Sequence, residues 1–326
     1  MFVDVTCSYV PVEIIHAAGF TPRRLLPPTA KETGLLPPNY CSYARACAAT
    51  DDGVPVIFTT CCDALRRCND VRKARGDRVF ILDLPRQAKD TSVRYYRGEL
   101  RKMAQWLQEI SGRPVPDETL QNSFQVYQQL RAKLKQFEST AGINEKFYDL
   151  LFAVIAESPE DIFSFFKTTA VKPAGNETGQ KRRSVLLAGT ILPDPGILAL
   201  LAENDAAVKA ADFCLGERFF YLEPGFSAPD DIWLTLAKAY LGKPPCPRMA
   251  GKSSRAFYIQ NILNRLMPDG VIFYGLKFCD HGLYEVPLWR LLCSQREIPF
   301  LHLEGEYLNG IPAQLRTRLQ AFLETI

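Results

Sequence analysis

The stretch Gly53-Val-Pro-Val-Ile-Phe-Thr-Thr-Cys61-Cys62-Asp63 returns in the second half of the chain as Gly270-Val-Ile-Phe-Tyr-Gly-Leu-Lys-Phe-Cys279-Asp280. Each copy is a short run of β-branched and aromatic residues that stops at Cys-Asp, a pattern typical of a buried strand in a parallel sheet. In open α/β sheets, ligands bind at the carboxyl ends of the strands. The repeat therefore predicts a site with thiols, assembled between two similar halves of the chain.

Further matches between the halves indicate a duplication. Cys41-Ser-Tyr-Ala-Arg45 precedes the first Cys-Asp strand, as Cys246-Pro-Arg-Met249 precedes the second. The strand-like residues 2–6 and the helical pattern after them also resemble residues 185–189 and the helical pattern that follows. We expect an α/β fold with two pseudo-equivalent, doubly wound (Rossmann-like) parallel-sheet subdomains, whose strand ends face a shared cleft.

The order of the patterns divides the chain into four parts. Residues 1–90 and 185–326 alternate strand and helix patterns and are predicted to be the two α/β domains. Residues 91–167 carry long amphipathic helical patterns without strands between them, which predicts a helical module that braces the first sheet. Residues 168–184 contain Gly, Pro and polar residues and are predicted to be a linker.

The expected elements follow from the same periodicities. The expected strands are residues 3–6, 54–60, 79–84, 185–188, 271–278 and 299–303, and residues 207–212 lead to Cys214. The expected helices are residues 11–18, 41–49, 95–110, 116–138, 144–156, 196–203, 231–240, 254–266 and 312–326, and residues 27–38 form a Pro-rich loop.

Composition excludes several classes of function. The chain has 326 residues, of which 47% are hydrophobic and 23% charged, as in an ordinary soluble globular protein. A formal net charge of +3 is too small to indicate a nucleic-acid-binding protein. The first residues have no signal-peptide pattern, and no apolar run is long enough to cross a bilayer. We therefore expect a cytoplasmic protein that binds neither nucleic acid nor membrane.

Ten cysteines are many for such a chain. In a reducing compartment they indicate metal ligation, thiol catalysis or simple burial rather than a disulfide framework. Cys68, Cys214 and Cys293 lie in or beside amphipathic patterns, where a cysteine usually acts as a small hydrophobic residue.

Common catalytic motifs are missing from the chain. It has neither a Gly-x-Gly-x-x-Gly dinucleotide motif nor a Gly-x-Ser-x-Gly elbow. Gly251-Lys252-Ser253 resembles the end of a P-loop, but Cys246 stands where the first glycine should be, so a helix start is the better interpretation. His16 falls in an amphipathic helix, whereas His281 follows Cys279-Asp280 and is a candidate proton donor.

The cysteine spacing favours an iron–sulfur centre over two alternatives. A nucleophilic Cys62 at a strand-to-helix turn would not explain why Cys41, Cys246 and Cys279 occupy related positions. Structural zinc usually requires close Cys-x-x-Cys pairs, and the chain has no such knuckle. Widely separated cysteines at loop tips suit a cubane, whose thiolates arrive from several directions.

The motifs, in their order, resemble those of the 2-hydroxyacyl-CoA dehydratase/benzoyl-CoA reductase family, and the resemblance spans nearly the whole chain. It is carried by Cys7-Ser-Tyr-Val-Pro-Val-Glu-Ile-Ile-His-Ala-Ala-Gly19, Cys41-Ser-Tyr-Ala-Arg45, Thr60-Cys61-Cys62-Asp63-Ala-Leu-Arg66-Arg67, Asp83-Leu-Pro85, Asp212-Phe-Cys-Leu-Gly-Glu-Arg218-Phe, Cys246-Pro-Arg248-Met249, and Asp269-Gly-Val-Ile-Phe with Lys277-Phe-Cys279-Asp280. The resemblance implies two similar α/β domains per subunit and a cubane held by Cys41, Cys62 and Cys279.

The doubled Cys61-Cys62, Cys7 and the short chain are most similar to the branch called double-cubane cluster proteins. This resemblance implies an [8Fe–9S] centre that needs six protein thiolates, and electrons supplied by a separate ATP-hydrolysing activator with its own [4Fe–4S] cluster. The implied ligands are Cys41, Cys62, Cys246 and Cys279, with Cys61, Cys7 and Cys214 competing for the remaining positions. A homodimer is expected from the resemblance alone.

The function implied first is ATP-dependent, low-potential reduction of a small molecule by an iron–sulfur reductase subunit. One alternative is a dehydratase subunit with a single [4Fe–4S] cluster that removes water from a 2-hydroxyacyl-CoA by a ketyl-radical route. The others are a non-catalytic iron–sulfur electron carrier and a structural zinc protein.

Charged residues near the implied ligands complete the predicted site. Arg45, Arg66, Arg248 and Lys277 either contact sulfide, substrate or activator, or are ordinary surface cations. Of these, Arg45 and Lys277 join His281 as the predicted catalytic residues.

Overall fold

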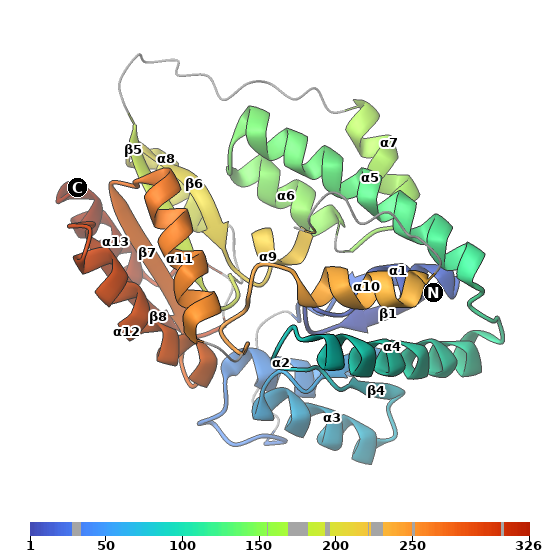
Figure 1. Ribbon diagram of the computed structural model, residues 1–326. Helices are drawn as coiled ribbons and strands as arrows, with labels where there is room; N and C mark the ends of the chain where they lie inside the picture. Colours follow the sequence, from blue (N-terminus) through green and yellow to red (C-terminus); the bar gives the residue numbers. More distant parts are fainter. Residues whose placement is uncertain are drawn as a thin grey trace.

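Within the residues that the structure describes, two parallel sheets of four strands each form the two lobes (Figure 1). The computed structural model describes residues 1–27, 34–154, 156–168, 182–192, 196–220, 222, 231–249, 252–307 and 310–326. Most of the predicted linker, part of the Pro-rich loop and Gly251 of the P-loop-like segment lie outside these residues.

The two sheets have the same strand order, which confirms the predicted α/β fold class. In the first lobe the order is β2-β1-β3-β4, with all neighbours parallel. In the second it is β6-β5-β7-β8, again all parallel. The strands are β1 (Phe2–Val5), β2 (Thr21–Arg24), β3 (Val56–Thr59), β4 (Val79–Leu82), β5 (Arg183–Gly189), β6 (Ala206–Asp212), β7 (Gly270–Leu276) and β8 (Phe300–Gly305).

The topological switch point has the same place in each lobe. The chain order reverses between β1 and β3 in the first sheet and between β5 and β7 in the second. Ligands of doubly wound sheets bind at such switch points, outside the carboxyl ends of the strands. β3 and β7 are the two copies of the repeated pattern, and both are fully buried.

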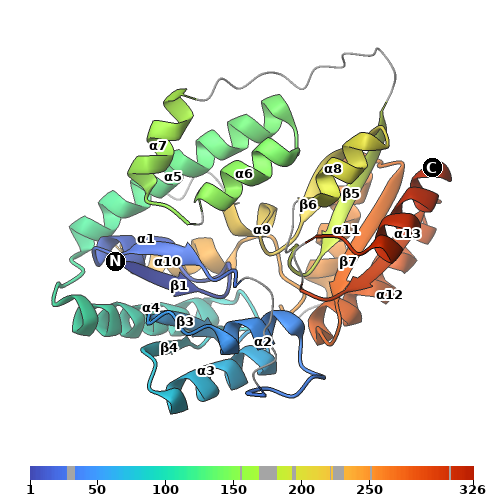
Figure 2. The ribbon, with the colours of Figure 1, turned by 180° about the vertical axis from the view of Figure 1, so that it is seen from behind.

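Helices cover the sheets in the alternation that the sequence predicts. The first lobe contains α1 (Val12–Ala17), α2 (Ser42–Ala49) and α3 (Asp63–Arg75), and the second contains α8 (Gly196–Glu203), α9 (Glu217–Phe220), α11 (Lys252–Leu266), α12 (Asp280–Ser294) and α13 (Ala313–Glu324). In both views α2 and α9 lie between the two sheets (Figure 2).

The middle of the chain is helical and packs on the first lobe. It consists of α4 (Asp90–Ser111), α5 (Asp117–Ala141), α6 (Glu145–Val154) and α7 (Pro159–Thr168). α4 packs against β4 and α5 against α1. A later helix, α10 (Ile232–Leu241), also lies along α4 (Figure 1). Its Trp233 and Tyr240 share a hydrophobic core with Val3 and Tyr96, so this segment of the second half is built into the first lobe.

The strands and helices expected from the sequence do not include β2, α3, α7, α9 and α12. β2 has the sequence Thr-Pro-Arg-Arg, which lacks the apolar alternation of a strand, but it is an edge strand, where Pro22 and charged residues are tolerated. α7 begins at Pro159, after residue 156, where the last helical pattern expected for the middle of the chain ends. Within the described residues, no helix is both long and apolar enough to cross a membrane.

Candidate functional site

The repeated Cys-Asp pattern places a cysteine at the start of a helix in each lobe. Cys62 is the N-cap of α3, and its Sγ accepts a hydrogen bond from the Leu65 amide at 3.5 Å. Cys279 is the N-cap of α12. Phe278 before it has a left-handed φ of 60°, which turns the chain sharply between β7 and α12. Both thiols therefore lie at helix N-termini.

Thiols from the two lobes meet at Cys41 and Cys279. Cys41 is the N-cap of α2 in the first lobe. The hydrogen bond from Cys279 lowers the pKa of Cys41 to about 7, and the same contact, with burial, raises the pKa of Cys279 well above its ordinary value. The two thiols therefore interact across the boundary between the lobes.

A second contact joins the two copies of the repeated pattern. The Nε2 of His281 donates to the carbonyl oxygen of Cys61 at 2.9 Å. Burial lowers the pKa of His281 below its ordinary value. A neutral ring with its hydrogen on Nε2 can make this bond. The predicted proton donor therefore connects the loop of Cys279 to the loop of Cys61 and Cys62.

Cys7, Cys61 and Cys62 form a group in the first lobe. Cys7 follows β1, while the other two follow β3, which pairs with β1. Hydrogen bonding to Cys61, followed by burial, raises the pKa of Cys7 well above its ordinary value. Hydrogen bonding to Cys62 has the same effect on Cys61.

Cys214 and Cys246 connect this group to the second lobe. Burial is the main cause that raises the pKa of each, to about 12 for Cys246. The charges of Cys214 and Cys7 act on Cys246, and that of Cys7 also acts on Cys214. Cys214 in turn contributes to the field at Cys279. Pairwise interactions therefore link the seven cysteines proposed as cluster ligands, namely Cys7, Cys41, Cys61, Cys62, Cys214, Cys246 and Cys279.

The remaining cysteines lie in the cores. Cys47, Cys68 and Cys293 are fully buried, and the Cys68 thiol donates to the carbonyl oxygen of Ala44 at 3.0 Å. Cys214 is different because it is only partly buried and lies among the other thiols. The structural interpretation thus fits Cys68 and Cys293, whereas Cys214 stays a candidate ligand.

Within the described residues, no group of three or more His, Cys, Asp or Glu side chains has the geometry to hold a single metal ion. The thiols instead interact with one another in pairs. The chemistry of the donor set nevertheless suits an iron–sulfur cluster, because the donors are soft thiols on loops from several directions. N–H groups also point at them, from Leu65 to Cys62, from Arg248 to Cys246 at 3.5 Å, and from Arg218 to Cys214 at 3.9 Å.

Buried cations around the thiols are a second observation that suits an anionic cluster. Arg24, Lys243 and Arg248 are 5%, 3% and 4% exposed, and no carboxylate of the described residues forms an ion pair with them. Lys243 donates to the carbonyl oxygens of Ser8 at 2.8 Å and Phe219 at 2.9 Å. Burial lowers the pKa of Lys243 to about 7, so this amine is only partly charged near neutral pH, whereas a guanidinium stays protonated in proteins. Buried charges normally have a counter-charge, so the two buried arginines fit a negatively charged group among the thiols.

Arg248 connects the second-lobe loop to the first sheet. Its guanidinium donates to the carbonyl oxygens of Leu84 at 2.6 Å and Pro85 at 2.9 Å, just after β4. Cys246, two residues earlier, donates its amide to Tyr9 Oη at 3.2 Å. These bonds hold the Cys246 loop against the carboxyl end of the first sheet.

Arg45 and Lys277, both predicted to be catalytic, converge on one carboxylate. Arg45 Nη2 lies 3.4 Å and Lys277 Nζ 3.8 Å from the carboxylate oxygens of Glu306. Glu306 also acts on the neighbouring Cys41 thiol, whose pKa its charge tends to raise. Arg66, by contrast, faces solvent and lies 3.9 Å from Asp63 of its own helix, as an ordinary surface cation does.

A buried ion network supports the Cys214 loop. Asp212 ends β6 and accepts from Arg218 at 2.6 Å and also from Arg255, which in turn pairs with Glu285. Arg218 further donates to the carbonyl oxygen of Gly189 at 2.8 Å. A Cβ at Gly189 would overlap the Tyr274 carbonyl, so only glycine allows this close packing of β5 on β7.

Sequence reasoning did not find Arg24, Lys243, Glu306 or the Asp212 network. Lys243 precedes Cys246 by three residues, and Arg218 lies in the Asp212-Phe-Cys segment, so proximity to a cysteine was an available signal for both. Arg24 and Glu306 stand beside no motif, and only the strand order brings them to the thiols.

Comparison with known proteins gives a consistent result over the whole chain. Residues 7–326 match the family model described as 2-hydroxyglutaryl-CoA dehydratase, D-component. The chain is 24% identical to the beta subunit of (R)-2-hydroxyglutaryl-CoA dehydratase from Acidaminococcus fermentans, over 98% of this chain and 90% of that protein. It is 23% identical to the beta subunit of (R)-phenyllactyl-CoA dehydratase from Clostridium sporogenes, over 98% and 90%. It is 22% identical to one of the subunits of benzoyl-CoA reductase from Thauera aromatica, over 98% and 89%.

Proposed function

Because the chain belongs to the 2-hydroxyglutaryl-CoA dehydratase D-component family, we propose that it carries a double-cubane [8Fe–9S] cluster and reduces a small molecule in an ATP-dependent reaction. Its relatives are subunits of acyl-CoA dehydratases and of benzoyl-CoA reductase, which supports the interpretation that this chain is also an enzyme subunit. The observation that supports a double cubane is the series of pairwise interactions that links seven cysteines from both lobes. One cubane takes up to about four thiolates, so this set is larger than a single cluster requires.

The proposed ligands come from both lobes. Cys41, Cys62, Cys246 and Cys279 have related positions in the two halves, and Cys7 and Cys61 complete the six thiolates. Cys214 is the competitor for one of these positions. When bound, such a cluster supplies electrons at low potential, to a degree that depends on burial and on hydrogen bonds to sulfur.

The protein's own residues would bind and tune this cluster. Backbone and side-chain N–H groups that point at Cys62, Cys214 and Cys246 lower the energy of thiolate ligands. His281 holds the two cysteine-bearing loops together through its bond to Cys61. Arg45 and Lys277, which are partly exposed beside Cys41 and Cys279, are proposed to position substrate or to receive the electron donor.

The proposed partner is a separate ATP-hydrolysing activator with a [4Fe–4S] cluster. This chain lacks a nucleotide-binding motif, so the energy of ATP has to enter through another protein. We further propose a homodimer in the cytoplasm, where reducing conditions keep the thiols available.

A dehydratase subunit with one [4Fe–4S] cluster is the second candidate. It is favoured by two of the relatives, both of which are dehydratase beta subunits. Cys41, Cys62 and Cys279 would then hold the cubane, and the other four thiols would serve packing.

Anaerobic metal analysis separates the two candidates. The protein is purified without oxygen, and iron and acid-labile sulfide are measured per chain. About eight irons support the double cubane and about four support the dehydratase. A protein that binds only zinc, with no visible iron–sulfur absorption, would contradict both.

Cysteine variants then identify the ligands. Cys62→Ser and Cys279→Ser should each lower the iron content, whereas Cys293→Ser, a buried core position, serves as the matched control and should keep it. Cys214→Ser tests the competitor. Turnover of a small reducible substrate with ATP and a matched activator distinguishes the reductase from a non-catalytic electron carrier.

A further inference from the structure

Arg24 is a buried cation at the carboxyl end of β2. It is 5% exposed, and among the described residues neither its Nε nor its Nη1 has a hydrogen-bond partner. Its register partner on β1 is Val5, two residues before Cys7. Leu25, the next residue, makes two backbone hydrogen bonds. Its amide donates to the carbonyl oxygen of Val5 at 3.0 Å, and its carbonyl oxygen accepts from the Tyr43 hydroxyl at 2.9 Å. The backbone around Arg24 is therefore held in place beside the thiols.

The groups whose charges act most on Arg24 are thiols and a phenol rather than carboxylates. Burial alone would lower its pKa, but the fields of Tyr43, Cys214, Cys7 and Cys47 outweigh burial, and the pKa is raised. Two of these, Cys7 and Cys214, are proposed cluster ligands, and they belong to different lobes. The guanidinium thus interacts electrostatically with thiols of both lobes.

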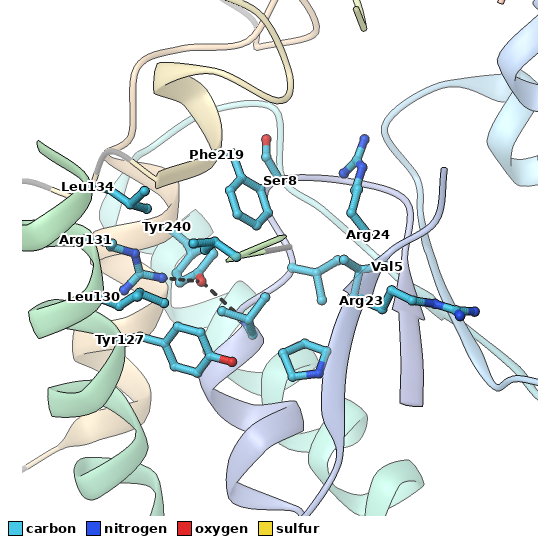
Figure 3. Close-up of a pocket in the computed structure, with 14 residues that line it drawn as sticks. Val5, Ser8, Arg23, Arg24, Tyr127, Leu130, Arg131, Leu134, Phe219 and Tyr240 are labelled. Atoms are coloured by element: carbon cyan, nitrogen blue, oxygen red, sulfur yellow. Dashed lines mark hydrogen bonds between the residues drawn. The ribbon is translucent and has the colours of Figure 1, made fainter. Parts of the chain in front are cut away.

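Three arginines line the pocket between β2 and α5, and of these Arg24 alone has no carboxylate partner in the described part of the chain (Figure 3). Arg23 binds Asp4 with two hydrogen bonds, at 2.6 and 2.9 Å, and Asp52 at 3.0 Å. Arg131 pairs with Glu13 at 2.7 Å and donates to Tyr240 Oη at 3.1 Å. Figure 3 shows Arg24 and Arg23 extending in different directions from β2, with Arg24 on the side of Ser8.

The same pocket is too small and too apolar to supply a counter-ion of its own. Most of its lining is aliphatic or aromatic, including Val5, Leu130 and Phe219, and it has room for only one or two water molecules. An organic anion therefore does not fit beside Arg24. The scarcity of water also means that the charge of Arg24 is poorly screened, so its effect on nearby charges is strong.

We propose that Arg24 is the counter-charge of the thiolate-bound cluster and stabilises its reduced state. The inference rests on the proposed function, since it requires a cluster among the thiols. Reduction adds negative charge next to a fixed cation, so the guanidinium favours the reduced cluster and raises its midpoint potential. Arg24 is a tuning residue, and it neither ligates iron nor contacts substrate.

The test compares the midpoint potentials of wild type, Arg24→Gln, Arg24→Lys and the neighbouring Arg23→Gln, measured by anaerobic spectroelectrochemistry together with iron content. Arg24→Gln should lower the equilibrium constant for cluster reduction at least tenfold, which is about 59 mV for a one-electron couple. Arg24→Lys keeps the charge and should recover at least half of that shift. Arg23→Gln removes a paired arginine from the same strand and should leave the potential unchanged.

Each outcome decides the inference. An unchanged potential in Arg24→Gln with full iron content overturns it, as does an equal shift in Arg23→Gln. Where Arg24→Gln folds but loses its cluster, the iron content of Arg24→Lys decides. A normal iron content in Arg24→Lys supports a requirement for positive charge. Loss of iron from both variants overturns the inference and indicates that Arg24 only fills space. The iron assay is done before any potential is measured. If it finds no iron–sulfur centre in the wild-type protein, that result contradicts the proposed function itself.

Discussion

His281 of the second lobe donates a hydrogen bond to the carbonyl oxygen of Cys61 in the first lobe, over 2.9 Å. The two residues belong to the two copies of the repeated Cys-Asp pattern, 220 positions apart in the chain. Together with the contact between Cys41 and Cys279, this bond joins the strand ends of the two lobes.

Loss of this bond should loosen the junction. We expect His281→Ala to lower the free energy of unfolding by about 1 kcal/mol, the usual net value of one such hydrogen bond. It should also accelerate iron release to a chelator, because the loops of Cys61 and Cys279 are no longer joined. The matched control is His16→Ala, whose ring bonds Ser123 at 2.8 Å within the first lobe and its helices. Equal iron release from both variants would contradict the junction role of His281.

The stability of the protein should fall as the pH drops below the ordinary histidine pKa. Burial lowers the pKa values of His281 and His302 from 6.5, so the unfolded chain binds protons more readily than the folded one. The stability that the two neutral imidazoles contribute is fully present above about pH 6.5 and is lost as the pH falls through that value toward their folded pKa values. Thermal unfolding between pH 7.5 and 5 measures this. The variant with both His281→Gln and His302→Gln should have a flatter profile, and an unchanged profile would show that other groups control it.

Mild oxidation of the metal-free protein should join the lobes through Cys41 and Cys279. The pKa of Cys41 is about 7, so much of it is thiolate near neutral pH, and its hydrogen-bond partner is the thiol of Cys279. Non-reducing peptide mapping should find this disulfide, while the buried Cys68 stays free. A disulfide between Cys41 and Cys47 of the same helix would instead indicate that the lobes do not meet as described. Bound cluster should protect the pair.

The sequence predicted the parts of this site that have a local pattern. An apolar run that stops at Cys-Asp is visible without a structure, and its repetition indicated both the duplicated sheets and the cysteine-bearing strand ends. Cys214 was harder, because a cysteine beside an amphipathic pattern is equally typical of a core residue. Its place among the thiols depends on the turn after β6, which no periodicity indicates.

The rest depends on tertiary structure. β2 was not predicted because an edge strand needs little apolar character. Arg24 was not predicted either, because only the folded structure buries it near the thiols. Glu306 follows β8 at the far end of the chain, and only the strand order brings it to Arg45. α10 joins the first lobe although its sequence position assigns it to the second half.

Arg45 and Lys277 should matter for turnover and little for stability. Their ion pairs with Glu306 are partly exposed and long, 3.4 and 3.8 Å, and such pairs contribute about 0–1 kcal/mol. We expect the double variant Arg45→Gln, Lys277→Gln to keep its iron content and lose at least tenfold in activator-dependent reduction. The control is Arg67→Gln, which breaks a surface pair with Asp70. Full activity in the double variant would remove both residues from the proposed catalytic set.

The buried network around Asp212 should be the most sensitive point of the second lobe. Burial tends to raise the pKa of Asp212, but Arg218 and Arg255 outweigh it, so the folded pKa lies below the ordinary value of 3.8. Its contribution to stability is therefore present above about pH 3.8 and is lost as the pH falls through the lower folded value. Removal of the carboxylate charge leaves the buried Arg218 without a carboxylate partner and Arg255 with Glu285 alone.

We accordingly expect Asp212→Asn to lower the free energy of unfolding at pH 7 by about 3–5 kcal/mol, as when one partner of a buried ion pair is lost. Asp70→Asn, which breaks only the exposed pair with Arg67, should change it by less than about 1 kcal/mol. Urea unfolding of the three proteins measures the difference. Because Arg218 also donates to Cys214, Asp212→Asn should in addition make the Cys214 thiol more reactive to alkylation in the metal-free protein. A variant that unfolds within about 1 kcal/mol of wild type and leaves Cys214 equally protected would show that the two arginines find other partners.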